Sequence, residues 1–71
     1  MINWLRYLKA SARSADKVLF NGWCEGQYTT DQTIAKMKKN NKMPQYITID
    51  REDFIRWLGS LGYRRRVNVE R

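Results

Sequence analysis

The 71-residue sequence contains no histidine, one cysteine, one proline and no long apolar run. Without histidine, the usual general base near neutral pH is missing. Cys24 is alone, so it cannot form the internal disulfides that hold small secreted scaffolds together. No apolar run reaches the roughly 18 residues that span a bilayer, and Arg6 and Lys9 stand where a signal peptide is apolar. We therefore expect a soluble protein of the reducing cytoplasm.

Candidates for catalysis are few. Cys24 is the only thiol nucleophile, but no histidine can activate it and Glu25 stands beside it. Asp50, Glu52 and Asp53 form an acidic group whose place at the start of a helix explains them as cap and dipole partners. No metal-ligand spacing or phosphate-binding glycine loop occurs. We expect no catalytic residues, no metal and no cofactor, and hence no enzyme.

Positive charge is abundant instead. Fourteen Lys and Arg residues against seven Asp and Glu residues give a net charge of +7. The partner should therefore be acidic, and nucleic acid or an acidic protein surface would both serve. We expect no membrane partner, because the first helix carries few cations on its polar face. With 42% hydrophobic and 13% aromatic residues, the chain is expected to fold as one small domain over residues 1–71.

The first helix is predicted from apolar spacing. Apolar or small residues recur in steps of three and four from residue 1 to residue 19, which predicts a helix over residues 2–20. Asn21 and Gly22 follow, and Gly22 is expected to provide the left-handed cap. The same pair also suits a hairpin turn, so residues 17–24 are either a helix end or a hairpin.

Two further helices are predicted from their caps. Thr29 and Gln32 have the spacing of a capping box, which opens a second helix that ends before Pro44. Asp50 caps a third helix, and Gly62 ends it.

Short strands are predicted at residues 45–49 and 65–69, where β-branched residues alternate with polar ones. Val67 and Val69 would face the core. The expected fold class is mainly α with a small β component, in the order α–α–β–α–β: a compact three-helix domain with a short two-stranded ribbon. The predicted core consists of Leu5, Leu8, Leu19, Ile34, Met37, Ile47, Ile49, Phe54, Leu58 and Leu61.

Half of the 14 cations fall into two clusters. The lysine cluster is Lys36, Lys38, Lys39 and Lys42, and the arginine cluster is Arg64, Arg65 and Arg66. No acid interrupts either cluster, and the amides of Asn40, Asn41 and Gln45 near the lysines can bond phosphates or base edges. A solvated helix face is the alternative explanation for the lysines.

The arginine cluster follows the third helix directly. In an extended segment Arg64 and Arg66 share one face, which makes a fork for phosphates. Arg65 then faces the other way, where it packs on an aromatic side chain or pairs with Glu70. Tyr63 either stacks on a base or covers the end of the third helix.

A stretch of about twenty residues, "KKNNKMPQYITIDREDFIRWL", resembles the later part of excisionase-like winged-helix DNA-binding proteins. The residues that carry the resemblance are Lys42, Met43, Pro44, Arg51, Glu52, Asp53, Phe54, Trp57 and Leu58. It implies that the second helix faces a DNA groove. The sequence departs from that family in two ways: only one helix of a helix-turn-helix is evident just before the stretch, and the residues between Pro44 and Asp50 are too few for a full wing.

The leading hypothesis is a small non-enzymatic nucleic-acid-binding protein, with DNA favoured, acting as a regulatory or accessory factor of a phage or mobile element. The alternative is a protein-binding modulator or inhibitor that docks basic and aromatic residues on an acidic partner surface. Trp23, Tyr28 and Tyr63 are the candidate partner-contact aromatics. The alternative requires Trp23, expected to be the most exposed tryptophan, and Tyr28 to be exposed in one patch.

Overall fold

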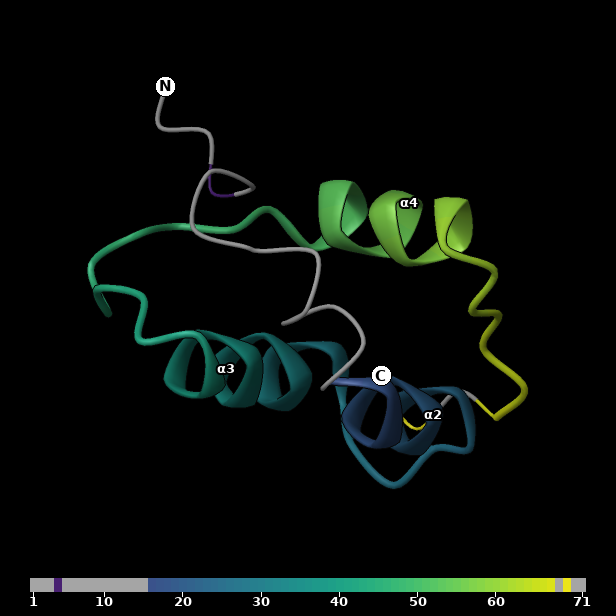
Figure 1. Cartoon of the computed structure of the whole chain (residues 1–71). Coiled ribbons are helices and arrows are strands. Elements are labelled where there is room, and N and C mark those ends of the chain that lie inside the picture. The colour runs from purple at the N-terminus through teal and green to yellow at the C-terminus, as the bar shows by residue number, and fades with distance from the viewer. Residues whose placement is uncertain (1–3, 5–15, 68, 70–71) are drawn as a thin grey trace.

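The computed structural model describes Trp4, residues 16–67 and Val69, and these contain three α-helices. Helix α2 spans Lys17–Cys24, α3 spans Thr30–Asn40 and α4 spans Arg51–Ser60. In Figure 1, α4 lies above α2 and α3, residues 41–50 close one side, and residues 61–67 return from α4 toward α2 on the other. None of the helices in the described ranges is both long enough and apolar enough to cross a membrane.

The starts of α3 and α4 confirm the predicted caps. The Thr29 hydroxyl accepts the Gln32 N–H at 3.1 Å, and the Gln32 side-chain oxygen accepts the Thr29 N–H at 3.0 Å. The Asp50 carboxylate accepts the N–H groups of Glu52 and Asp53 at 2.8 and 3.2 Å. Both caps satisfy N–H groups that have no partner within the helix.

All three described helices end in the same backbone motif. A residue with positive φ follows each C-cap: Gly26, Lys42 and Gly62. The next N–H bonds to the carbonyl five residues earlier, joining Gln27 to Gly22, Met43 to Lys38 and Tyr63 to Leu58 at 2.9, 2.9 and 3.0 Å. This is the Schellman arrangement, which satisfies carbonyls at the helix end. It confirms Gly62 as the end of the third predicted helix.

The predicted end of the first helix is wrong. Helix α2 passes through Asn21 and Gly22, so neither the cap at Gly22 nor the alternative hairpin exists, and Gly26 ends the helix instead. Gly22 lies under the ring of Tyr28, and a Cβ there would stand 2.6 Å from the Tyr28 ring. Glycine is therefore needed for close approach rather than for positive φ. The sequence predicts a helix from residue 2, whereas α2 begins at Lys17 after the N-cap Asp16; residues 2, 3 and 5–15 of the predicted helix lie outside the described residues.

The predicted ribbon is also wrong, because the described residues form no strand. Ile47 and Ile49 are buried and Tyr46 is exposed, so the alternation is real, but this segment lies on the core without a pairing partner. The C-terminal segment goes elsewhere: the N–H groups of residues 66 and 67 both donate to the Cys24 carbonyl, at 2.8 and 3.3 Å. A strand forms only where a neighbour completes its hydrogen bonds.

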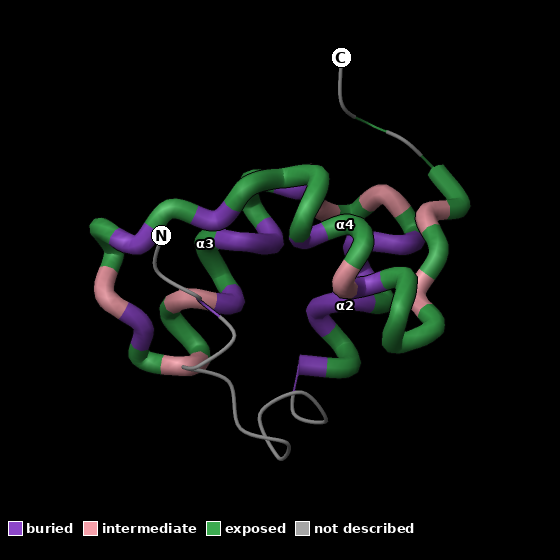
Figure 2. The backbone as a smooth tube through the Cα atoms, turned by 90° about the horizontal axis from the view of Figure 1, so that it is seen from above, coloured by how far each residue is buried: buried purple, intermediate pink, exposed green. Residues whose placement is uncertain are grey.

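The core lies between the three helices and the 43–49 segment, where buried residues recur (Figure 2). Leu19, Ile34, Met37, Ile47, Ile49, Phe54 and Leu58 are buried as predicted, and Trp4, Phe20, Trp23, Cys24 and Met43 join them. Leu61 is 37% exposed, and Val67 and Val69 are exposed, so these three predictions are wrong. Leu5 and Leu8 lie outside the described residues.

Aromatic rings hold α4 on α2. The Phe20 ring meets those of Phe54, Trp57 and Tyr63 with centroids 6.2, 5.5 and 5.3 Å apart, in edge-to-face geometry. Such pairs add to the stabilisation from buried area. Tyr63 thus covers the end of α4, one of its two expected roles.

Lys42 adopts a backbone conformation that favours glycine, with φ of 54°. We expect Lys42→Gly to raise the free energy of unfolding by about 0.5–1 kcal/mol, because the left-handed conformation costs a residue with a Cβ roughly that much. Urea denaturation measures the change. Lys42→Ala removes the charge but keeps the Cβ and should give no gain. An equal increase in the free energy of unfolding in both variants would mean that loss of the charge, not relief of the backbone conformation, causes the stabilisation.

Candidate nucleic-acid interface

The lysine cluster is divided between two sides of α3. Lys36 and Lys39 line an open hollow of about 370 Å³ between α2 and α3. We call it the lysine hollow; its other lining residues are Val18, Leu19, Tyr28 and Asn40. The ammonium of Lys38 instead lies 3.4 Å from the Gln45 carbonyl oxygen. Lys42 is exposed just beyond the end of α3.

Lys36 is positioned by an aromatic ring. Its ammonium lies over the Tyr28 ring, 5.1 Å from the centroid, and the Tyr28 ring rests on Gly22. A cation over a ring face is attracted to it but keeps its charge. Lys36 and Lys39 are exposed, and no acidic residue among those described pairs with either. The lysine hollow therefore presents uncompensated positive charge.

Three arginines among the described residues are paired with acids. Three ion pairs join described residues, each at 3.4 Å: Asp31 with Arg51, Asp53 with Arg56, and Glu25 with Arg66. All are exposed, so each adds little stability, but each neutralises charge locally.

Two of the three amides beside the lysine cluster, those of Asn40 and Asn41, have partners within the fold. Asn40 and Asn41 donate to the two carboxylate oxygens of Asp16, at 3.2 and 3.0 Å. Asp16 is buried, and these bonds tie the start of α2 to the end of α3. The sequence predicts that these amides bond phosphates or base edges, but in the structure Asn40 and Asn41 are already bonded to Asp16.

The three consecutive arginines have three different environments. Arg64 is exposed and has no acidic partner among the described residues. Arg66 pairs with Glu25. Arg64 and Arg66 do line a common hollow of about 400 Å³ beside the end of α2, although the segment is not a strand. Of the predicted pair, Arg64 is the unpaired cation.

Arg65 turns toward the core. Its guanidinium lies over the Trp23 ring, 4.9 Å from the centroid, and its Nε donates to the Val67 carbonyl at 3.0 Å. Its two terminal nitrogens are closed off from solvent and have no hydrogen-bond acceptor among the described residues. This is the aromatic packing expected as one alternative for Arg65.

Trp23, expected to be exposed, is 2% exposed. Its indole N–H donates to the Thr30 hydroxyl at 3.0 Å. The prediction is wrong because the predicted helix stops at residue 20, before Trp23. In the structure α2 continues to Cys24, and Trp23 lies one turn after Leu19 and Phe20 on the buried side of the helix.

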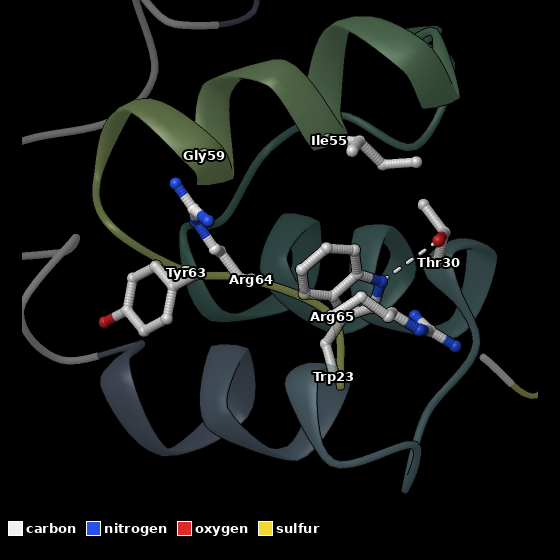
Figure 3. A pocket seen from close by; sticks show the side chains of 7 residues that line it. All are labelled: Trp23, Thr30, Ile55, Gly59, Tyr63, Arg64 and Arg65. Atoms are coloured by element: carbon white, nitrogen blue, oxygen red, sulfur yellow. Dashed lines mark hydrogen bonds between the residues drawn. The ribbon is translucent and has the colours of Figure 1, made fainter. Parts of the chain in front are cut away.

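A third hollow, of about 360 Å³, lies between α4, the segment that follows it, the end of α2 and the start of α3 (Figure 3). We call it the Trp23 hollow; its lining residues are Trp23, Thr30, Ile55, Gly59, Tyr63, Arg64 and Arg65. Sequence reasoning missed this site, although an isolated glycine inside a predicted helix, Gly59, was a visible signal. The lysine and Trp23 hollows share no lining residue.

Comparisons with family models, curated proteins and solved structures found no match to this chain. The resemblance to excisionase-like proteins therefore rests on the quoted residues alone, and residues 45–49 form no wing strand. Within the described ranges, no group of three or more His, Cys, Asp or Glu side chains could hold a metal ion.

Proposed function

We propose that the protein binds nucleic acid, with DNA favoured, as a non-enzymatic regulatory or accessory factor. One observation carries the proposal: Lys36, Lys39, Lys42 and Arg64 are exposed and have no acidic partner among the described residues. The described acids, by contrast, are engaged by other groups, except for Glu52.

The positions of the lysines suit a phosphate backbone. Lys36 and Lys39 are three residues apart and share one face of α3. Lysine contacts to phosphates release counterions from the nucleic acid, so the affinity they provide falls with salt and depends little on base sequence.

The protein-binding alternative required Trp23 and Tyr28 to be exposed in one patch. Trp23 is buried, and Tyr28 is half-buried between Gly22 and Lys36. The exposed Trp23–Tyr28 patch that this alternative requires is therefore not formed, and the alternative remains an outcome of the test.

The test compares two variants that each lose two positive charges. Lys36→Ala/Lys39→Ala removes unpaired cations, whereas Arg51→Ala/Arg56→Ala removes cations that already pair with Asp31 and Asp53. We expect the lysine variant to lower the slope of log affinity against log salt by about 1.8 on duplex DNA between about 50 and 200 mM salt, and the arginine variant to lower it less.

Fluorescence anisotropy with a labelled duplex gives both slopes. Equal slopes for the two variants would mean that net charge, not the lysine face of α3, determines binding. A lysine variant parallel to the wild type would show that these lysines do not contact phosphates and would favour an acidic protein partner.

A further inference from the structure

The Trp23 hollow has the size and lining of a small-ligand site. Its volume of about 360 Å³ falls within the range of about 300–1,000 Å³ typical of such sites. In Figure 3, Ile55 and Gly59 of α4 lie on one side, Trp23 and Thr30 on the other, and Tyr63 at one end. Ile55 is 41% exposed, so an apolar side chain remains uncovered here. A Cβ on Gly59 would meet no atom within 4 Å, so the hollow is open beside α4.

The charge around the Trp23 hollow is positive only. Arg64 and Arg65 line it, and no acidic residue does. The terminal nitrogens of Arg65 are closed off from solvent and have no acceptor in the described part of the chain, which leaves a poorly solvated cation beside the hollow. An anionic group bound nearby would offset that cost. Arg64, which is exposed and unpaired, can donate to such a group directly.

An apolar hollow with a cationic rim fits a ligand that has a flat apolar body and an anionic group. Nucleotides have this composition, because every base has an apolar face and every phosphate a negative charge. A base inside a duplex is stacked and paired, so only an unpaired base can enter a pocket.

We infer that the Trp23 hollow binds one unpaired nucleotide, with its base between Ile55 and Tyr63 and its phosphate on Arg64. The inference rests on the proposed function and deepens it: the protein engages single strands through a site that duplex DNA cannot use. The lysine hollow then supplies phosphate contacts to either form.

Filling the hollow provides the test. Gly59→Leu places a side chain in it without removing any existing contact, and leucine favours a helix more than glycine does. Ser60→Leu adds the same side chain at the adjacent exposed position, which does not line the hollow. We expect Gly59→Leu to weaken binding of a labelled oligothymidylate by about tenfold and to leave duplex affinity unchanged. Ser60→Leu should change neither affinity.

Nuclear magnetic resonance distinguishes a strand from a free nucleotide. The indole N–H signal of Trp23 should shift when oligothymidylate is added to the wild type, and shift more weakly with thymidine monophosphate, which lacks the lysine contacts. Neither ligand should shift it in Gly59→Leu. A shift with the monophosphate but not with the strand would overturn the inference as stated.

The two proposals fail in different ways. If Gly59→Leu binds oligothymidylate as tightly as the wild type, the nucleotide site is wrong, while salt-dependent duplex binding by the wild type would leave the proposed function standing. If the wild type binds neither single strands nor duplex, both are wrong.

Discussion

Leu58→Ala should lower the free energy of unfolding by about 2–5 kcal/mol, the range for truncating a buried leucine. Leu58 is 0% exposed and lies in the core with Phe20 and Phe54. A domain of this size buries a modest share of its surface, so such a loss is a large part of its total stability. Thermal denaturation followed by circular dichroism measures the change.

Leu61→Ala is the matched control, since the sequence assigned both leucines to the core. Leu61 is 37% exposed, and its truncation should cost less than about 1 kcal/mol. An unchanged melting temperature for Leu58→Ala would remove that side of α4 from the core, and equal losses in both variants would mean that Leu61 is buried.

Asp16→Ala should cost about 1.5–3 kcal/mol, because hydrogen bonds to a charged acceptor are among the stronger ones. Asp16 is 3% exposed, and its carboxylate accepts from both Asn40 and Asn41. The substitution breaks the polar link between the start of α2 and the end of α3.

A double-mutant cycle isolates that link from the general effect of substituting a buried residue. Urea denaturation of Asp16→Ala, Asn41→Ala and the double variant should give a coupling energy of about 1 kcal/mol. Additive losses would show that the carboxylate and the amide do not stabilise one another.

The starts and ends of α3 and α4 could be predicted because their causes are local. The Thr29–Gln32 capping box and the Asp50 cap each involve residues within one helical turn. Local reasoning could not choose between Gly22 and Gly26 as the end of α2, because each glycine stands two positions after an apolar residue. The two glycines differ in that the Tyr28 ring packs on Gly22. That contact forms only when the turn after α2 brings Tyr28 back to the helix, so it is not visible in the local sequence.

The ribbon failed for a non-local reason. Ile47 and Ile49 alternate with exposed neighbours, and that pattern predicted their burial correctly. It did not reveal whether residues 65–69 would pair with them. The position of that segment is set instead by the Cys24 carbonyl at the end of α2, which accepts the N–H groups of residues 66 and 67.

The candidate site was predictable in composition but not in arrangement. The two basic clusters were evident in the sequence, yet only the folded chain separates Lys38 from Lys36 and Lys39. Similarly, Arg65 lies on Trp23 because the C-terminal segment crosses the end of α2. Neighbouring cations in a sequence therefore do not share a surface until tertiary packing places them there.

The most direct test of nucleic-acid binding is the affinity of the wild-type protein for DNA as a function of salt. If the four exposed cations of the two clusters that have no acidic partner among the described residues, Lys36, Lys39, Lys42 and Arg64, contact phosphates, log affinity for duplex DNA should fall linearly with log salt, with a slope of about −3.6. No binding at about 50 mM salt, or an affinity that does not change with salt, would contradict the proposed function.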